Sequence, residues 1–101
     1  MIARVWFGRT KASDYDTYVE YLERSGVPEL ERTPGNRGVI VLRRVDGDEA
    51  EFGVISFWDS VERVKAFAGE DVDIARYFPE DERYLLELTP KLKHFDVAHG
   101  R

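Results

Sequence analysis

Residues 39–58, VIVLRRVDGDEAEFGVISFW, contain two runs rich in β-branched and aromatic residues, separated by the Asp-Gly pair at positions 46 and 47. Such runs are typical of β-strands, and Asp-Gly between them is typical of a tight hairpin. We therefore predict two antiparallel neighbouring strands. Apolar side chains occupy successive positions, as at Val39 and Ile40, so we expect both faces of this hairpin to be covered.

The segments that flank the hairpin complete a small sheet. Alternation in residues 2–10 predicts an N-terminal strand with Arg4 and Trp6 on one face and Ala3 and Phe7 on the other. Alternation after Pro90, in residues 91–98, predicts a fourth strand. The sequence therefore predicts a four-stranded antiparallel sheet.

Helical spacing appears in three segments between these strands. A first helix is predicted to begin near Ser13 and to end at Gly26, with one further short turn in the PELER stretch at 28–32. A second is predicted after Asp59, whose carboxylate would cap it, and a third short one at 71–78. Residues 80–88 are ambiguous. The order is β-α-β-β-α-α-β, an α+β arrangement of the ferredoxin-like type.

Composition limits the possible functions of the chain. It has 101 residues, 43% hydrophobic and 35% charged, with a formal net charge of −5 and no cysteine. We expect a single domain over residues 1–101, located in the cytoplasm, without disulfides or thiolate metal sites. No basic stripe and no apolar run near the ~20 residues of a membrane span are present, so neither nucleic acid nor membrane is an expected partner. The acidic residues around positions 46–51 are interpreted as part of the hairpin turn and not as metal ligands. No metal and no cofactor is predicted.

The sheet has more apolar surface than its own helices can cover. Right-handed connections place the helices on one face, and each large side chain left exposed on the other face would forgo roughly 1.5–3 kcal/mol of burial free energy. A second copy of the chain is the predicted cover. Two sheets facing one another would form a homodimeric barrel with a cavity between them for a hydrophobic or aromatic small molecule.

Three stretches resemble the antibiotic biosynthesis monooxygenase family of dimeric α+β barrel proteins: IARVWFGR at 2–9, SFWDSVERVKAFAG at 56–69 and HFDV at 94–97. The resemblance extends over nearly the whole chain. It implies a homodimeric α+β barrel and a monooxygenase that needs no cofactor and acts on an aromatic or enolisable small molecule. A non-catalytic dimer of the same fold, which binds a small molecule or acts as a scaffold, is the alternative.

The resemblance also suggests a site. The residues predicted to be catalytic are Trp58, Tyr77, His94 and Arg4, and those predicted to bind substrate are Trp6, Phe52, Val54 and Ser56. Alternative structural roles remain open for the first four. Trp58 could fill the core, Tyr77 could be a core contact, Arg4 could lie at the rim, and His94 could be independent of Asp96 on the same strand face.

Two departures from the family pattern bear on haem chemistry. Asn36, the one asparagine, lies in a turn, whereas active family members carry an asparagine on a strand that faces the cavity. Arg76 and Tyr77 stand where haem-degrading relatives have a histidine ligand. On these grounds we do not expect haem degradation.

Overall fold

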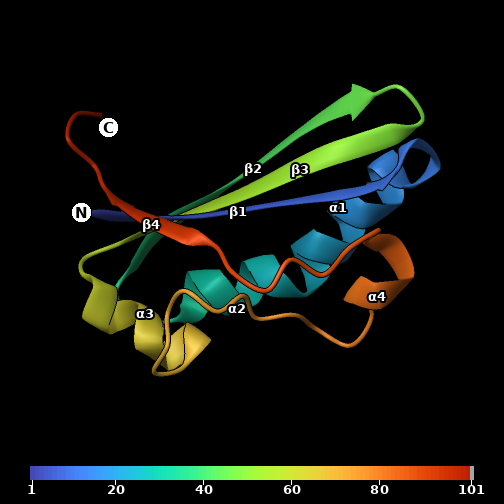
Figure 1. The fold of residues 1–101 in the computed structure, drawn as a ribbon. Helices are drawn as coiled ribbons and strands as arrows, with labels where there is room; N and C mark the ends of the chain where they lie inside the picture. Colours follow the sequence, from blue (N-terminus) through green and yellow to red (C-terminus); the bar gives the residue numbers. More distant parts are fainter. Residues whose placement is uncertain (101) are drawn as a thin grey trace.

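A four-stranded antiparallel sheet forms one layer of the protein, for which the computed structural model describes residues 1–100. The strand order is β2-β3-β1-β4, so the N-terminal strand lies in the interior of the sheet (Figure 1). The strands are β1 (Ile2–Lys11), β2 (Asn36–Asp46), β3 (Glu49–Trp58) and β4 (Lys93–Asp96). The predicted hairpin is confirmed, since β2 and β3 pair with Val41 opposite Val54, and Gly47 adopts a positive φ of 66° in the turn.

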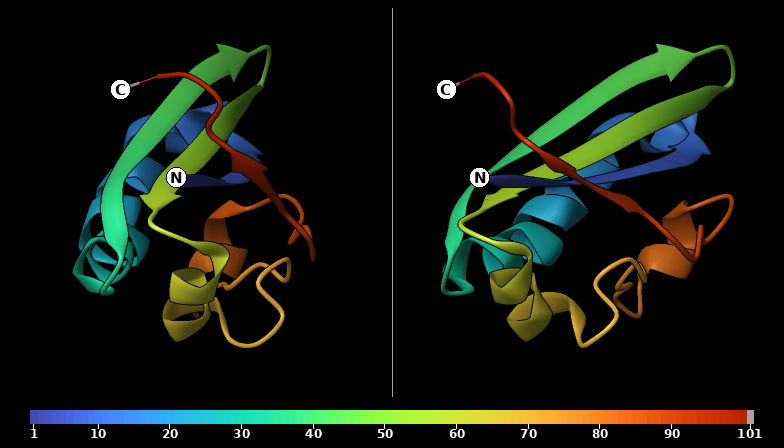
Figure 2. Two further views of the ribbon diagram at one scale, coloured as in Figure 1. Left: turned by 90° about the vertical axis from the view of Figure 1, so that its left-hand side faces the viewer. Right: turned by 60° about the vertical axis from the view of Figure 1, so that its left-hand side comes forward.

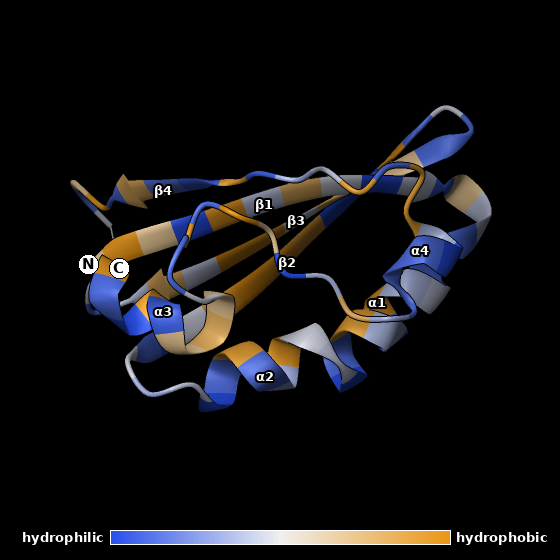
Figure 3. Cartoon of the chain, turned by 60° about the horizontal axis from the view of Figure 1, so that its bottom comes forward, coloured by the Kyte–Doolittle hydropathy of each residue, from blue (hydrophilic) through white to orange (hydrophobic). Residues whose placement is uncertain are grey.

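The helices form a second layer on one face of the sheet only (Figures 1 and 2). They are η1 (Ala12–Asp14), α1 (Tyr15–Arg24), α2 (Gly26–Arg32), α3 (Val61–Ala68) and α4 (Asp81–Tyr84). Seen from the helix side, hydrophobic positions of the strands lie behind this layer (Figure 3). The predicted α+β, ferredoxin-like architecture is confirmed. None of the helices in residues 1–100 is long and apolar enough to cross a membrane.

Two helix ends differ from the prediction. Gly26 does not terminate the first helix. Helix α1 ends at Arg24, Ser25 interrupts the helical conformation, and α2 begins at Gly26. Pro28 lies in the first turn of α2, where proline is tolerated. The cap of α3 is the Ser60 hydroxyl, which accepts from the Arg63 N–H, whereas the Asp59 carboxylate accepts from Arg37 Nε at 2.7 Å.

The predicted helix over 71–78 is also wrong. This segment belongs to a long connection between α3 and β4, residues 69–92, which we call the strap. Within the strap the Ala75 N–H donates to the Pro90 carbonyl and the Leu92 N–H to the Asp73 carbonyl, so backbone groups that a helix would pair locally bond across the loop. The one short helix of the strap is α4, in the stretch that was ambiguous.

The face of the sheet opposite the helices is open. Side chains directly opposite one another on paired strands share a face, which places Phe7, Leu42 and Phe95 together with Ile40 on this side. Their exposed fractions range from 46% to 51%. The surplus of apolar surface expected from the sequence is therefore present in the chain.

Candidate functional site

A pocket lies between the helix-facing side of the sheet and the strap. The sheet contributes Arg4, Trp6, Val54 and Ser56, α1 and α2 contribute apolar side chains, and the strap closes the other side. Its lining is mostly apolar and aromatic, and it encloses about 70 Å³. The sheet supplies these residues from one face because alternate positions of β1 and β3 point the same way.

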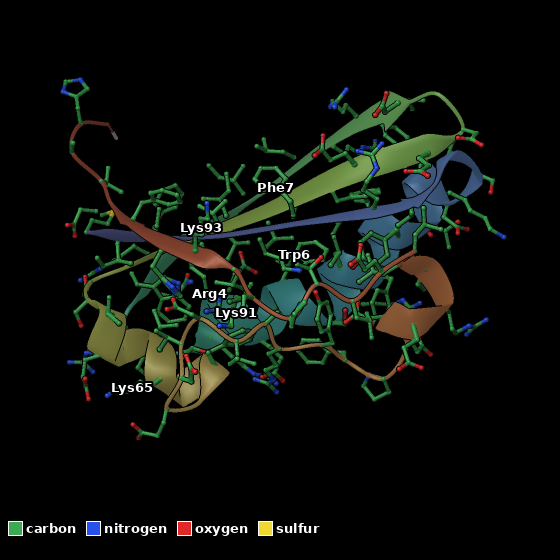
Figure 4. All side chains as sticks on the ribbon, in the orientation of Figure 1. Arg4, Trp6, Phe7, Lys65, Lys91 and Lys93 are labelled. Atoms are coloured by element: carbon green, nitrogen blue, oxygen red, sulfur yellow. The ribbon has the colours of Figure 1, made fainter. Side chains whose placement is uncertain are left out.

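The position of this pocket corrects the sequence analysis. Arg4 and Trp6 were expected to line a cavity between the sheets of two copies, but they point toward the helix layer, whereas Phe7 points to the open face (Figure 4). The reason is the period of two along β1, which puts neighbouring residues on opposite faces. The pocket is thus built by one chain.

Arg4 is a charged side chain in the wall of this pocket, only 4% exposed. Its Nη1 donates to the Val72 carbonyl at 2.5 Å and lies 3.1 Å from His94 Nε2, and its Nη2 is 3.5 Å from the Ile74 carbonyl. Burial lowers the pKa of Arg4 to about 10, with a smaller opposing effect of Asp73, so the guanidinium stays charged at neutral pH. A buried cation of this kind is costly unless an anion meets it.

His94 on β4 supports Arg4 from outside the pocket. Because His94 Nε2 faces the donating guanidinium, its Nδ1 carries the proton and donates to Asp73 Oδ1 at 3.0 Å. Burial lowers the pKa of His94, and proximity to Arg4 adds to this, whereas Asp73 acts in the opposite direction. The carboxylate that orients the imidazole is therefore Asp73 on the strap, and the expected partner Asp96 makes no such contact within residues 1–100.

Trp6 and Tyr77 join the sheet to the strap inside the pocket. The Trp6 indole N–H donates to the Tyr77 hydroxyl at 3.1 Å, and that hydroxyl donates to the Thr89 carbonyl at 2.5 Å. The two rings pack edge to face with centroids 6.3 Å apart. Burial is the main effect that raises the pKa of the Tyr77 phenol, so it is neutral at physiological pH.

Trp58 and Phe52 lie behind the pocket and do not line it. Both are fully buried, and Trp58 packs in the core with Leu30 and Val64. The Trp58 indole N–H donates to Ser56 Oγ at 2.9 Å, and Ser56 does line the pocket. Trp58 therefore contacts the pocket through this serine and not with its own ring. This is the arrangement expected if Trp58 fills the core, and a functional role for Trp58 stays a prediction.

Two charged residues of the pocket, both on the strap, were not predicted from the sequence. Asp81 is buried, accepts from the Tyr18 hydroxyl at 3.1 Å and from the Phe78 N–H at 2.6 Å, and has its pKa raised by burial. Arg76 lies with its guanidinium over two aromatic rings, 4.8 Å from the centroid of Phe67 and 4.9 Å from that of Phe78. The available signal for Asp81 was the run of acidic residues at 80–82, directly after Pro79 and within the ambiguous stretch 80–88.

Comparisons with known proteins identify the fold. No protein-family profile matches the chain, and no curated protein matches it. Two solved structures are similar over its whole length, each 21% identical in sequence. One is a variant of MhuD with two manganese protoporphyrin IX molecules bound per active site, with a TM-score of 0.62 over 98% of that chain. The other is the haem degrader MhuD of Mycobacterium tuberculosis with two haems bound in its active site, with a TM-score of 0.61 over 99% of that chain.

These neighbours contradict the function predicted from the sequence. The sequence led us to expect a cofactor-independent monooxygenase or a non-catalytic dimer. Haem degradation was not expected, because the chain lacks the asparagine on a cavity-facing strand and has Tyr77 where haem-degrading relatives have a histidine. The similar structures are a haem degrader and its variant, with haem or a manganese porphyrin bound. The expectation against haem degradation is therefore contradicted by these neighbours.

Proposed function

We propose that this chain binds haem as its substrate in the pocket beneath the strap and degrades it as a monooxygenase. The observation that carries the proposal is a buried, charged Arg4 in the wall of an otherwise aromatic and apolar pocket, in the fold of a haem degrader. An apolar ring with acidic substituents requires this combination of surfaces.

The pocket offers one side chain suited to the iron. No histidine, cysteine or methionine lines it, whereas the phenol of Tyr77 does, and a tyrosine can hold haem iron. Burial favours the neutral phenol, and the charge of ferric iron favours the phenolate that would bind it. Iron binding would replace the hydrogen bond from Tyr77 to the Thr89 carbonyl.

A porphyrin needs more room than this pocket provides. Its volume of about 70 Å³ is well below the ~300–1,000 Å³ of pockets that hold drug-sized ligands. Haem binding therefore requires the strap to move away from the sheet. Several groups hold the strap there. They are the contacts of Arg4 and Tyr77, the hydrogen bonds that join Tyr18 to Asp81, His94 to Asp73, Arg76 to the Phe67 carbonyl and the Leu86 N–H to the Arg9 carbonyl, and the burial of Leu85 in the core.

The proposal also covers the type of domain, its location in the cell and its oligomeric state. We propose that the chain is one domain of the antibiotic biosynthesis monooxygenase type, in the cytoplasm, and a homodimer in which a second copy covers the open face. The exposed Phe7, Ile40, Leu42 and Phe95 support the homodimer, because a contiguous apolar patch of this kind marks an interaction surface.

The test is a titration of the purified protein with haemin, followed by absorbance. Binding in the pocket shifts the Soret band, and Tyr77→Phe changes the ligand-to-metal bands, whereas Tyr84→Phe, whose hydroxyl makes no hydrogen bond within residues 1–100, leaves them unchanged. Addition of ascorbate under oxygen then bleaches the Soret band of the wild-type complex. A protein that leaves the spectrum of haemin unchanged does not have the proposed function.

A further inference from the structure

The guanidinium of Arg4 has more donors than the chain uses. Its contacts to Val72 and His94 are made by Nη1, and Nη2 makes one long contact, to the Ile74 carbonyl. Within residues 1–100, Nε donates no hydrogen bond. Arginine binds a carboxylate in a bidentate manner through two neighbouring N–H groups, and in Arg4, which lines the pocket, Nε and the second N–H of Nη2 are the pair left for this.

A second cation stands at the same end of the pocket. Two guanidinium groups lie against the ring of Phe67, that of Arg4 at 5.7 Å and that of Arg76 at 4.8 Å from its centroid, and all three residues line the pocket. Arg76 donates through Nη1 to the Phe67 carbonyl, which fixes its position. Within residues 1–100, neither guanidinium forms a salt bridge, whereas Arg9, on the same strand as Arg4, is paired with Asp46 and Glu49.

The acids around this end do not neutralise it. Asp73 reaches Arg4 only through His94, and Asp81, which also lines the pocket, is bonded to Tyr18 and to the Phe78 N–H. We infer that the ligand of this pocket carries a carboxylate that binds the Nε and Nη2 edge of Arg4, with Arg76 as the second cation. The planar fork of one arginine matches a carboxylate, and the nearby acids disfavour a dianion such as phosphate.

This inference rests on the proposed use of the pocket as a ligand site and specifies the class of ligand: a flat apolar body with an acidic substituent. The first test compares haemin with haemin dimethyl ester, which has the same ring and iron but no free carboxylate. The ester cannot form the hydrogen-bonded ion pair with Arg4. We therefore expect it to bind about tenfold or more weakly than haemin. Equal affinity for acid and ester overturns the inference and leaves the haem proposal intact.

Variants assign the preference to the two arginines. In Arg4→Gln the acid-to-ester affinity ratio falls to near one, whereas Arg83→Gln, which removes an equal charge at an exposed position outside the pocket, keeps the wild-type ratio. Arg76→Gln, as a single substitution, also lowers the acid-to-ester affinity ratio. The ratio is the readout because a variant that only loosens the fold weakens both ligands alike. A ratio that stays at the wild-type value in Arg4→Gln and in Arg76→Gln places the carboxylate elsewhere.

A second probe separates the inference from the haem proposal. The melting temperature is measured with 2-naphthoate and with the uncharged 2-naphthamide, two ligands of the same size without iron. Stabilisation by the acid alone, lost in Arg4→Gln, supports the carboxylate site even if haemin does not bind. Equal stabilisation by both, or by neither, contradicts the carboxylate site.

Discussion

Arg4 on β1 and Val72 on the strap are joined by a 2.5 Å hydrogen bond from the guanidinium Nη1 to the carbonyl oxygen, across 68 positions of sequence. A buried cation of the sheet thus fastens the segment that closes the pocket. The same side chain lines the pocket, so its position links the ligand site to the position of the strap.

The first prediction concerns this fastening. Arg4→Gln leaves the Val72 carbonyl without its charged donor, and an unmade buried hydrogen bond of this type costs about 1–3 kcal/mol. We expect a corresponding loss in the free energy of unfolding in urea, and faster hydrogen exchange at the Ala75 and Leu92 amides, which pair within the strap. Arg83→Gln is the control, with a change within about 0.5 kcal/mol. Unchanged exchange at both amides would show that Arg4 does not hold the strap.

The elements that could be predicted are those whose signals are local. The hairpin of β2 and β3 follows from two β-branched runs and one Asp-Gly turn, and the shared face of Arg4 and Trp6 follows from the period of two along β1. These features do not depend on what packs against them, and the structure has them as predicted.

The strap could not be predicted because distant partners determine its conformation. Residues 71–78 have helical spacing, but the Val72 carbonyl bonds to Arg4, the Ala75 amide to Pro90, and the Tyr77 hydroxyl to Trp6 and Thr89. Tertiary contacts override weak helical propensity in so short a segment. Asp73, Arg76 and Asp81 belong to the strap, so their place at or near the pocket was hidden for the same reason.

The second prediction distinguishes the two tryptophans. Trp58 is fully buried in the core and bonds to Ser56, whereas Trp6 lines the pocket and bonds to Tyr77. We expect Trp58→Phe to lower the free energy of unfolding by about 1–3 kcal/mol, through a small cavity and an unpaired serine, with haemin affinity unchanged. Trp6→Phe should weaken haemin binding and shift the Tyr77-dependent bands. Reduced haemin affinity in a fully folded Trp58→Phe protein would instead assign Trp58 to the site.

The third prediction is a pH dependence of stability. The folded protein lowers the pKa of His94 below its ordinary value of 6.5, so it favours the neutral imidazole that accepts from Arg4 and donates to Asp73. The stability that His94 contributes is therefore complete above pH 6.5 and is lost as the pH falls through the lower folded pKa. Protonation would put a cation against Arg4, and only Asp73 would compensate.

The measurement is the difference in unfolding free energy between the wild type and His94→Gln, taken from pH 8 to pH 5. Glutamine can accept from Arg4 but does not titrate, so the difference isolates His94 from Asp81, whose raised pKa acts in the opposite direction. We expect the wild type to lose stability relative to the variant as the solution is acidified. A difference that stays constant, or that grows in favour of the wild type, contradicts the assigned role of the imidazole.

The last prediction concerns the open face of the sheet. Leu42 is 47% exposed on β2, beside Ile40, and two-fold symmetry would place it in the interface of both copies. Burying a leucine is worth roughly 1.5–3 kcal/mol, so Leu42→Lys removes about twice that amount from the dimer and weakens association by far more than tenfold. Val45→Lys is the matched control, because Val45 is an exposed residue of the same strand on the opposite face. Light scattering at micromolar concentration should show a dimer for the wild type and Val45→Lys, and a monomer for Leu42→Lys. A wild-type monomer under these conditions would mean that the face has no second copy on it, while the pocket, which one chain builds alone, would keep its proposed function.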